Sequence, residues 1–406
     1  MGIVGNGASY KILQEAGIDD ADLIIAVTGS DELNLLCCTI ATQVGNCAAI
    51  ARVRTPEYSQ EAKYLRDKLG LALIINPELE AAIEMAHILH LPSSLEVTNF
   101  AHGQAQLIKY EIPEGSILDG TKLMDLGTRH HANILIGAVE RDDEVTIPSG
   151  DFVLRKGDKL SFVGERKHTK EFFSHIGVNT HSVKNTLIIG GGKAAYYLAK
   201  QLISRGIKVK IIENSFERCE ELSILLPDAV IINGDGTEQA LLKEEGIETC
   251  QSFVPLTGID EENIMLTLYA KQVSNAKVIT KLNHITFTNV INSLDLGSVI
   301  SPKYITSEAI IAYVRAKKNS MNCNIETLYH MYDSRVEAIE FFVSENSNVT
   351  DIPLRDLKLK KHLLICFINR NGKIIIPTGN DSIQKNDTVM IITTHTGFTN
   401  LQDIME

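Results

Sequence analysis

Three small residues near the middle of the chain have the types and the spacing that suit binding of a pyrophosphate group. Gly190, Gly192 and Ala195 follow the apolar run of "TLIIGGGKAAYYLAKQL" and fill the three positions of a GxGxx(G/A) pattern. In this pattern the first glycine makes a tight turn, the second lets the pyrophosphate approach the backbone, and the small third residue lets a helix pack closely on a strand. The pattern therefore predicts a dinucleotide-binding loop.

An acidic residue follows the loop at the distance that such a site requires. Glu213 lies 213 − 190 = 23 residues beyond Gly190, close to the spacing of about 20 at which an acid accepts hydrogen bonds from ribose hydroxyls. An acid at this position favours NAD-type ligands over NADP-type ligands. A purely structural explanation also stands, in which the glycine turn only permits tight packing of a helix on a sheet.

The elements that must position these residues follow from the same region. "TLIIGGGKAAYYLAKQLISRGIKVKIIENS" indicates a buried strand, a glycine turn, an amphipathic helix that stops at Gly206, and a second strand that ends in the acid. "VIINGDGT" predicts a third strand that ends at Asp235 and Gly236, and "FVPLTGIDEEN" predicts a fourth that ends at Thr257. Because ligands bind outside the carboxyl ends of parallel strands, we expect these residues to converge on one crevice.

Two of these strand-end residues have alternative interpretations. Asp235 could hold an adenine amino group or a ribose, and Thr257 could face the phosphates of a ligand. Each could instead satisfy its own turn or cap the following helix.

Composition and charge limit the class of protein. The 406 residues are enough for about two to four domains. The net charge of -12 argues against a general nucleic-acid binder, because such proteins need clustered Lys and Arg to neutralise phosphates. No run of about 18 apolar residues is present, so we expect no membrane span. The 7 Cys show no regular framework spacing, which indicates a reducing cytoplasm.

Neither the cysteines nor the histidines suggest a metal site. The 7 Cys include no CxxC pair. The pair His130 and His131, together with His168, His175 and His181, does not follow any compact ligand spacing. We therefore expect no bound metal.

The chain contains a long internal repeat. "VGNGASYKILQEAGIDDADLIIAVTGSDELNLL" resembles "NGDGTEQALLKEEGIETCQSFVPLTGIDEENIML" at an offset of 234 − 5 = 229, and "ILIGAVERDDEVTIPSGD" resembles "LLICFINRNGKIIIPTGN" at the same offset. Each copy has an α/β part followed by a strand-rich part. We expect an α/β protein of four modules: residues 1–95 and 183–318 as Rossmann-like parallel-sheet domains, and residues 96–182 and 319–406 as small α+β domains.

The first copy lacks a counterpart of the beginning of the second copy. Residues 185 to about 229 have no equivalent, because subtracting 229 gives numbers below 1. We therefore expect an incomplete first Rossmann-like domain without its first β-α-β unit. A misplaced start codon, a cloning boundary or a natural short form would each explain this.

Taken together, these motifs resemble those of a known family. The loops "GNGAS" and "GDGTE", the segments "AVTGSDELN" and "PLTGIDEEN", "ARVRTPEY" and the strand-rich modules are similar to the TrkA family of Trk-system potassium uptake proteins, which are built from two RCK (regulator of potassium conductance) units. The resemblance implies a cytoplasmic regulatory ring, usually a tetramer. Such a ring docks on the inner face of the cell membrane under a potassium translocator and gates it in response to NAD, NADH, ATP or ADP.

The resemblance also implies which residues contact the nucleotide. In the second unit, the matching positions are Gly190, Gly192, Glu213, Asp235, Gly236 and Thr257. In the first unit they are Asn6, Thr28 and Arg54. Asn6 stands where the second copy has an acid, and Arg54 could equally be a surface arginine in an exposed loop.

Three functions are compatible with a dinucleotide loop. The first is a non-catalytic nucleotide sensor that regulates potassium uptake through a conformational change. The second is an NAD-dependent oxidoreductase, which would need a general acid or base beside the nicotinamide, and neither small module offers such a group in both copies. The third is an RCK regulator of a different cation channel or antiporter. We favour the sensor and expect no enzymatic activity.

Overall fold

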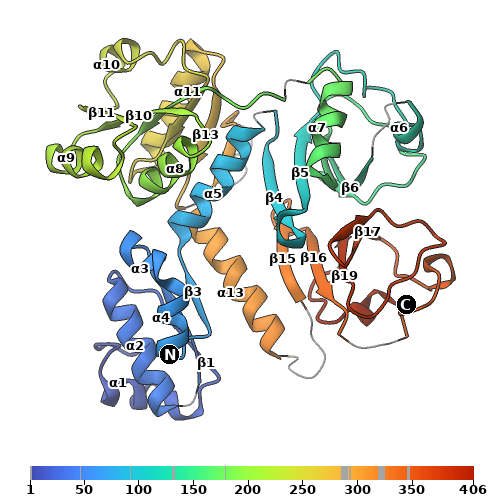
Figure 1. Cartoon of the computed structure of the whole chain (residues 1–406), viewed down its shortest axis with the longest axis horizontal. Coiled ribbons are helices and arrows are strands. Elements are labelled where there is room, and N and C mark those ends of the chain that lie inside the picture. The colour runs from blue at the N-terminus through green and yellow to red at the C-terminus, as the bar shows by residue number, and fades with distance from the viewer. Residues whose placement is uncertain are drawn as a thin grey trace. The chain divides into compact units, whose positions relative to one another are not determined.

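A computed structural model describes residues 2–45, 47–91, 93–129, 133–178, 180–284, 291, 294–318, 325–344 and 348–406 of the chain. The chain forms two compact units (Figure 1). One unit contains Met1–Ala86 and Lys184–Ile310, and the other contains His87–Val183 and Ile311–Glu406. The divisions between the units fall within helices α5 (Pro77–His90) and α13 (Pro302–Lys318).

The first unit contains a six-stranded parallel sheet built from the second repeat. Its strand order is β11-β10-β9-β12-β13-β14, so the order reverses between β9 and β12. The strands are β9 (Asn185–Ile189), β10 (Lys208–Glu213), β11 (Val230–Asn233), β12 (Ser252–Pro255), β13 (Lys277–Lys281) and β14 (Ser298–Ile300). The intervening helices are α8 (Lys193–Ile203), α9 (Phe216–Leu225), α10 (Gln239–Glu244) and α11 (Asp260–Val273). A reversal of this kind places a ligand crevice at the carboxyl ends of the two central strands.

The last three residues of the central strand β9 are apolar. Leu187, Ile188 and Ile189 of β9 are all buried. Continuous apolar sequence of this kind is typical of a parallel strand covered by helices on both faces. The prediction of a Rossmann-like α/β module is therefore confirmed.

The same unit also contains a three-stranded parallel sheet from the first repeat, in the order β1-β2-β3. Its elements are α1 (Tyr10–Glu15), a 3-10 turn (Ile18–Asp20), β1 (Leu23–Ala26), α2 (Asp31–Val44), β2 (Ala48–Arg52), α3 (Pro56–Gln60), α4 (Ala62–Leu69) and β3 (Leu73–Ile75). The offset of 229 aligns β1 and β2 with β12 and β13.

The two repeats differ at the inner edge of this sheet. Within the described residues, β1 pairs with β2 alone, whereas its equivalent β12 lies between β13 and β9. Ile25 of β1 is consequently 41% exposed, while Val254 at the equivalent position of β12 is 0% exposed. The first sheet thus presents an apolar strand edge that the second sheet covers with β9.

The second unit consists of two five-stranded antiparallel sheets with the same topology, β4-β5-β8-β6-β7 and β15-β16-β19-β17-β18. The first sheet is formed by β4 (Glu96–Phe100), β5 (Ala105–Glu111), β6 (Ile134–Arg141), β7 (Glu144–Thr146) and β8 (Lys159–Glu165), accompanied by α6 (Leu123–Arg129) and α7 (Arg166–His175). The second sheet is formed by β15 (Ile325–Met331), β16 (Val336–Phe342), β17 (Leu363–Arg370), β18 (Lys373–Ile375) and β19 (Thr388–Thr393). The strand-rich modules of the two repeats therefore share one fold.

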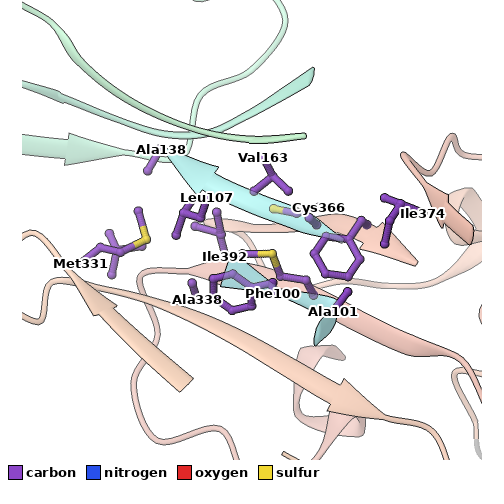
Figure 2. Close-up of a cluster of buried hydrophobic side chains, with 14 of the residues drawn as sticks. Phe100, Ala101, Leu107, Ala138, Val163, Met331, Ala338, Cys366, Ile374 and Ile392 are labelled. Atoms are coloured by element: carbon purple, nitrogen blue, oxygen red, sulfur yellow. The ribbon is translucent and has the colours of Figure 1, made fainter. Parts of the chain in front are cut away.

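These two sheets bury a common core, which is drawn in Figure 2. Phe100 and Leu107 of the first repeat and Ile392 of the second belong to one cluster of buried side chains. Polar contacts extend it, because the Tyr332 hydroxyl lies 2.6 Å from Ser161 Oγ. The small modules of the two repeats thus pack against each other within one unit. The boundaries assigned to the four modules from sequence remain a prediction.

Candidate functional site

The glycine loop lies between β9 and α8, at the point where the strand order reverses. Gly190 adopts a φ of 93°, in the left-handed region that glycine tolerates best, and its N–H donates to Ile212 O at 2.8 Å. A Cβ at this position would lie 3.0 Å from the Leu256 carbonyl oxygen. Gly190 is therefore required both by the turn and by the close approach of the next strand.

The acid predicted to follow the loop touches the loop directly. Glu213 ends β10, and its Oε2 accepts the N–H of Gly191 at 2.6 Å. Its Oε1 accepts the N–H of Ser215 at 2.7 Å. Two backbone hydrogen bonds thus hold the carboxylate at the mouth of the turn, where the sequence spacing places a group for ribose hydroxyls.

Gly192 differs from the other loop glycines because nothing in the fold requires it. Its φ is −65° and its ψ is −175°, which any residue adopts, and a Cβ would meet no atom within 4 Å. It stands directly before α8, whose first N–H groups have no partner within the helix. The space in front of Gly192 is therefore open to an anion at a helix N-terminus. Ala195, one turn further on, is fully buried, in agreement with the packing role expected for it.

Asp235 and Gly236 follow β11, next to the acid, because the Gly234 N–H donates to Glu213 O at 3.0 Å. Asp235 Oδ1 accepts the N–H of Thr237 at 2.8 Å and its hydroxyl at 2.7 Å, and these bonds lower the pKa of the exposed carboxyl. A Cβ on Gly236 would come 2.3 Å from the Ile189 side chain. Gly236 therefore permits close packing on β9, and Asp235 satisfies its own turn.

Thr257 stands at the end of β12, beside the glycine loop. Its N–H donates to Asn263 Oδ1 at 3.0 Å, and its hydroxyl lies 2.9 Å from the same oxygen and 3.1 Å from Ile259 O. Asn263 is fully buried, and its Nδ2 donates to Lys281 O at 3.0 Å. The asparagine thus ties the ends of β12 and β13 together, and in this structure the threonine hydroxyl serves its own loop.

The first module repeats this arrangement with the same residue types. Thr28 donates from both its N–H and its hydroxyl to Asn34 Oδ1, each at 2.7 Å, and Asn34 Nδ2 donates to Arg52 O at 2.9 Å. Asn6 also copies its counterpart, since its Oδ1 accepts the N–H of Ala8 at 3.0 Å. The segments "TGSDELN" and "TGIDEEN" therefore connect two strand ends by hydrogen bonds in both repeats.

Arg54 is held within the first module rather than extended into solvent. Its side chain is 24% exposed, its Nη2 donates to Gly29 O at 2.7 Å, and its Nε lies 3.5 Å from Asp31 Oδ1. Burial alone would raise the pKa of Asp31, but hydrogen bonds from Thr55 and from the Arg54 backbone hold it below its usual value. Thr28 and Arg54 meet at the turn that contains Gly29, because the Thr28 hydroxyl donates to Ser30 O and Arg54 Nη2 donates to Gly29 O.

Two side chains near the loop were not singled out from the sequence. Arg218 Nε donates to Gly191 O at 2.7 Å. Lys193, which follows the last loop glycine, lies 3.0 Å from Thr55 Oγ1 of the first module and 3.8 Å from Asp31 Oδ2. The sequence signal that could have identified Arg218 is its place five residues after the acid, on the first turn of a helix. The contact of Lys193 has no local sequence signal, because it joins segments 138 residues apart.

The described residues contain no group of three or more His, Cys, Asp or Glu side chains placed to hold a metal ion. His130 and His131 lie outside the part of the chain that the structure describes. No helix in the described ranges is both long and apolar enough to cross a membrane.

Comparison with known families identifies the domains. The model of the TrkA-N domain matches residues 1–77 and 186–302, and the model of the TrkA-C domain matches residues 107–177 and 338–405. A Trk system potassium uptake protein TrkA homolog of Methanosarcina mazei is 33% identical over 397 residues, which cover 96% of this chain and 87% of the relative. The chain belongs to the TrkA family. The TrkA protein of Haemophilus influenzae is 29% identical over 96% of this chain and 85% of its own length.

Family membership confirms the resemblance inferred from the sequence, and it confirms the prediction that the chain is not an enzyme. TrkA proteins are regulatory subunits built from tandem TrkA-N and TrkA-C units, not enzymes, so the oxidoreductase alternative is excluded. The GsuK RCK domain, a solved structure, has the same fold, with a TM-score of 0.61 and 18% identity over 96% of this TrkA-family chain and 82% of that chain. A structure of the GsuK channel bound to NAD gives a TM-score of 0.60 at 18% identity and covers 68% of that chain.

Proposed function

We propose that this TrkA-family chain is the nucleotide-sensing regulatory subunit of a Trk-type potassium uptake system. It binds NAD or NADH, with ATP or ADP as competing ligands, in the crevice of the second Rossmann-like module. It assembles as a tetramer on the inner face of the cell membrane and gates a potassium translocator. Membership of the TrkA family supports the biological setting, and the geometry of the glycine loop supports the ligand.

The single observation that carries the ligand proposal is the open space at Gly192. Gly190 is fixed by its turn and Gly236 by packing on β9, so the fold alone explains both. Gly192 has ordinary backbone angles and no neighbour within 4 Å of a Cβ, so packing does not explain it. A phosphate group that approaches the backbone at the start of α8 does explain it.

The residues around this space fit a dinucleotide. The N–H groups at the start of α8 would hold the pyrophosphate, and the free lone pairs of Glu213 would accept ribose hydroxyls. Asp235 and the backbone at Thr257 border the crevice at the ends of β11 and β12. In the first module, Asn6, Thr28 and Arg54 are the matching positions.

Regulation requires no chemical step in this scheme. A ligand that binds one arrangement of the subunit more tightly shifts the population toward that arrangement, and the shift is limited by the difference in the two affinities. The subunit therefore needs only a ligand that distinguishes two states and a translocator that does the same.

The ligand site is tested by replacing Gly192 with aspartate in the full-length protein. A carboxylate in the phosphate position is expected to weaken NADH binding at least about a hundredfold, because like charges in contact cost several kcal/mol. Ser204→Asp, at the opposite end of the same helix, is the matched control and should keep the affinity of the unchanged protein. Calorimetric titration measures both, and unaltered affinity in Gly192→Asp would remove the assigned site.

The regulatory role is tested with the translocator itself. Rubidium uptake into vesicles that contain the Trk-type translocator of the same genome should change when this protein is added, and should respond to NADH. The Gly192→Asp protein should bind the vesicles but lose the response to NADH. Uptake that is indifferent to the added protein would refute the proposed partner while leaving the ligand site intact.

A further inference from the structure

The backbone of Gly191 is held by two side chains of opposite charge. Its N–H donates to Glu213 Oε2 at 2.6 Å, and its carbonyl oxygen accepts from Arg218 Nε at 2.7 Å. A carboxylate and a guanidinium therefore contact the backbone of one residue at the turn of the glycine loop, through two consecutive peptide groups. Both head groups lie beside the position where the ribose of a bound dinucleotide is expected.

The fold fixes both head groups in these positions. Glu213 also accepts the N–H of Ser215, and the Ser215 hydroxyl in turn accepts the N–H of Arg218 at the start of α9. The Arg218 side chain is only 24% exposed. Its Nη1 lies 2.5 Å from Glu221 Oε2, but the Glu221 side chain is 56% exposed, so water weakens that pair. The positive charge is therefore positioned firmly and neutralised only in part.

The two charges have opposite effects on a phosphate attached to the ribose. An acid at the end of the second strand repels a 2′-phosphate, which is why it favours NAD-type ligands, whereas an arginine nearby accommodates that phosphate. Here both head groups contact the backbone of Gly191, at 2.6 and 2.7 Å, so the guanidinium offsets part of the field of the carboxylate. The acid alone predicts strict selection against 2′-phosphate, and the pair predicts weak selection.

We propose that Arg218 is a specificity-determining residue whose guanidinium offsets the charge of Glu213, so that the second module accepts dinucleotides with and without a 2′-phosphate on the adenosine ribose. This inference rests on the dinucleotide site proposed above. It assigns to Arg218 an effect on the ratio of the NADPH affinity to the NADH affinity, in addition to its hydrogen bond to the loop.

The test compares NADH with NADPH, whose own fluorescence reports binding to the full-length protein. Replacing Arg218 with methionine should weaken NADPH binding about tenfold more than NADH binding, because the repulsion by Glu213 is then unopposed. Glu213→Gln should change the ratio about tenfold in the opposite direction. Lys208→Met removes an exposed lysine at the other end of β10 and should leave the ratio unchanged.

A lysine variant separates charge from loop support. Arg218→Lys keeps the positive charge but loses the planar group that donates to Gly191, so both affinities should fall while the NADPH to NADH ratio is largely kept. If Arg218→Met lowers both affinities equally, Arg218 only supports the loop and the inference is wrong. If the unchanged protein binds neither dinucleotide, the proposed ligand site fails and the inference fails with it, which is a distinct result.

Discussion

The exposed edge of β1 allows one substitution to be compared between two equivalent positions. Val254 of β12 is fully buried, because β9 covers that edge, whereas Ile25 of β1 is 41% exposed. Val254→Ala removes buried methyl groups and leaves a cavity, at a cost of about 2.5 kcal/mol. Ile25→Ala removes more atoms but opens no cavity, and we expect a cost of about 1.5 kcal/mol or less.

The larger truncation is therefore expected to cost less than the smaller one. Two equivalent residues that are both fully buried provide the control: Ile50 of β2 and Ile279 of β13. Replacing either with alanine should cost about 3.5 kcal/mol. Equal losses at this pair would show that the two modules respond alike where their burial is alike.

Hydrogen exchange of the full-length protein is the suitable assay, because a chain of several modules has no single unfolding free energy. Mass spectrometry of peptides that contain β1 or β12 gives the opening free energy of each strand. An Ile25→Ala loss equal to or larger than the Val254→Ala loss would refute the reasoning. It would mean that another polypeptide segment covers the edge of β1 in solution.

Two further predictions concern buried polar groups. Asn263→Asp replaces the amide that donates to Lys281 O with an oxygen that faces it, so the opening free energy of β12, measured by the same hydrogen exchange, should fall by about 3 kcal/mol. Burial would raise the pKa of Glu337, but hydrogen bonds from His330 and Arg315 hold it below its ordinary value of 4.5. The stability that the ionised Glu337 provides is therefore present above pH 4.5 and is lost as the pH falls through the lowered pKa. Between about pH 6 and about pH 3, the urea midpoint should therefore drop less in Glu337→Gln than in the unchanged protein.

Sequence reasoning succeeded where the chain obeys local rules. The glycine loop and the acid lie in consecutive elements of one β-α-β unit, and their geometry follows from strand length, helix length and the glycine turn. Spacing alone therefore predicted that Glu213 lies beside the glycine loop; its hydrogen bond to the Gly191 N–H was not predicted. The repeat offset of 229 also predicted that β1 and β2 correspond to β12 and β13.

Sequence reasoning could not resolve how side chains divide their hydrogen bonds. Thr257 was compatible with phosphate contact or with a loop role, and only coordinates show its hydroxyl beside Asn263. The pairing of like modules was equally hidden, because a contact such as Tyr332 with Ser161 joins segments 171 residues apart. No local pattern encodes partners at that distance.

Among the described residues, an ion pair joins the two strand-rich modules at one place in their contact. Arg335 precedes Val336 of β16 and pairs with Glu140 of β6, with 2.5 Å between Nη2 and Oε1. The residue equivalent to Arg335 is Gln104, which precedes Ala105 of β5. The residue equivalent to Glu140 is Asn369 of β17, at the offset of 229. Both are neutral amides.

This asymmetry distinguishes correct from incorrect partners. If two second-repeat modules from different chains met, each Arg335 would face an amide and lose its carboxylate. If two first-repeat modules met, Glu140 would keep Lys159 as its cation but lose the arginine. Each mismatched pairing loses the ion pair between Arg335 and Glu140, so it is less favourable than the pairing of a first-repeat module with a second-repeat module. The contact between the two modules therefore has a polarity that a symmetric dimer of identical halves cannot have.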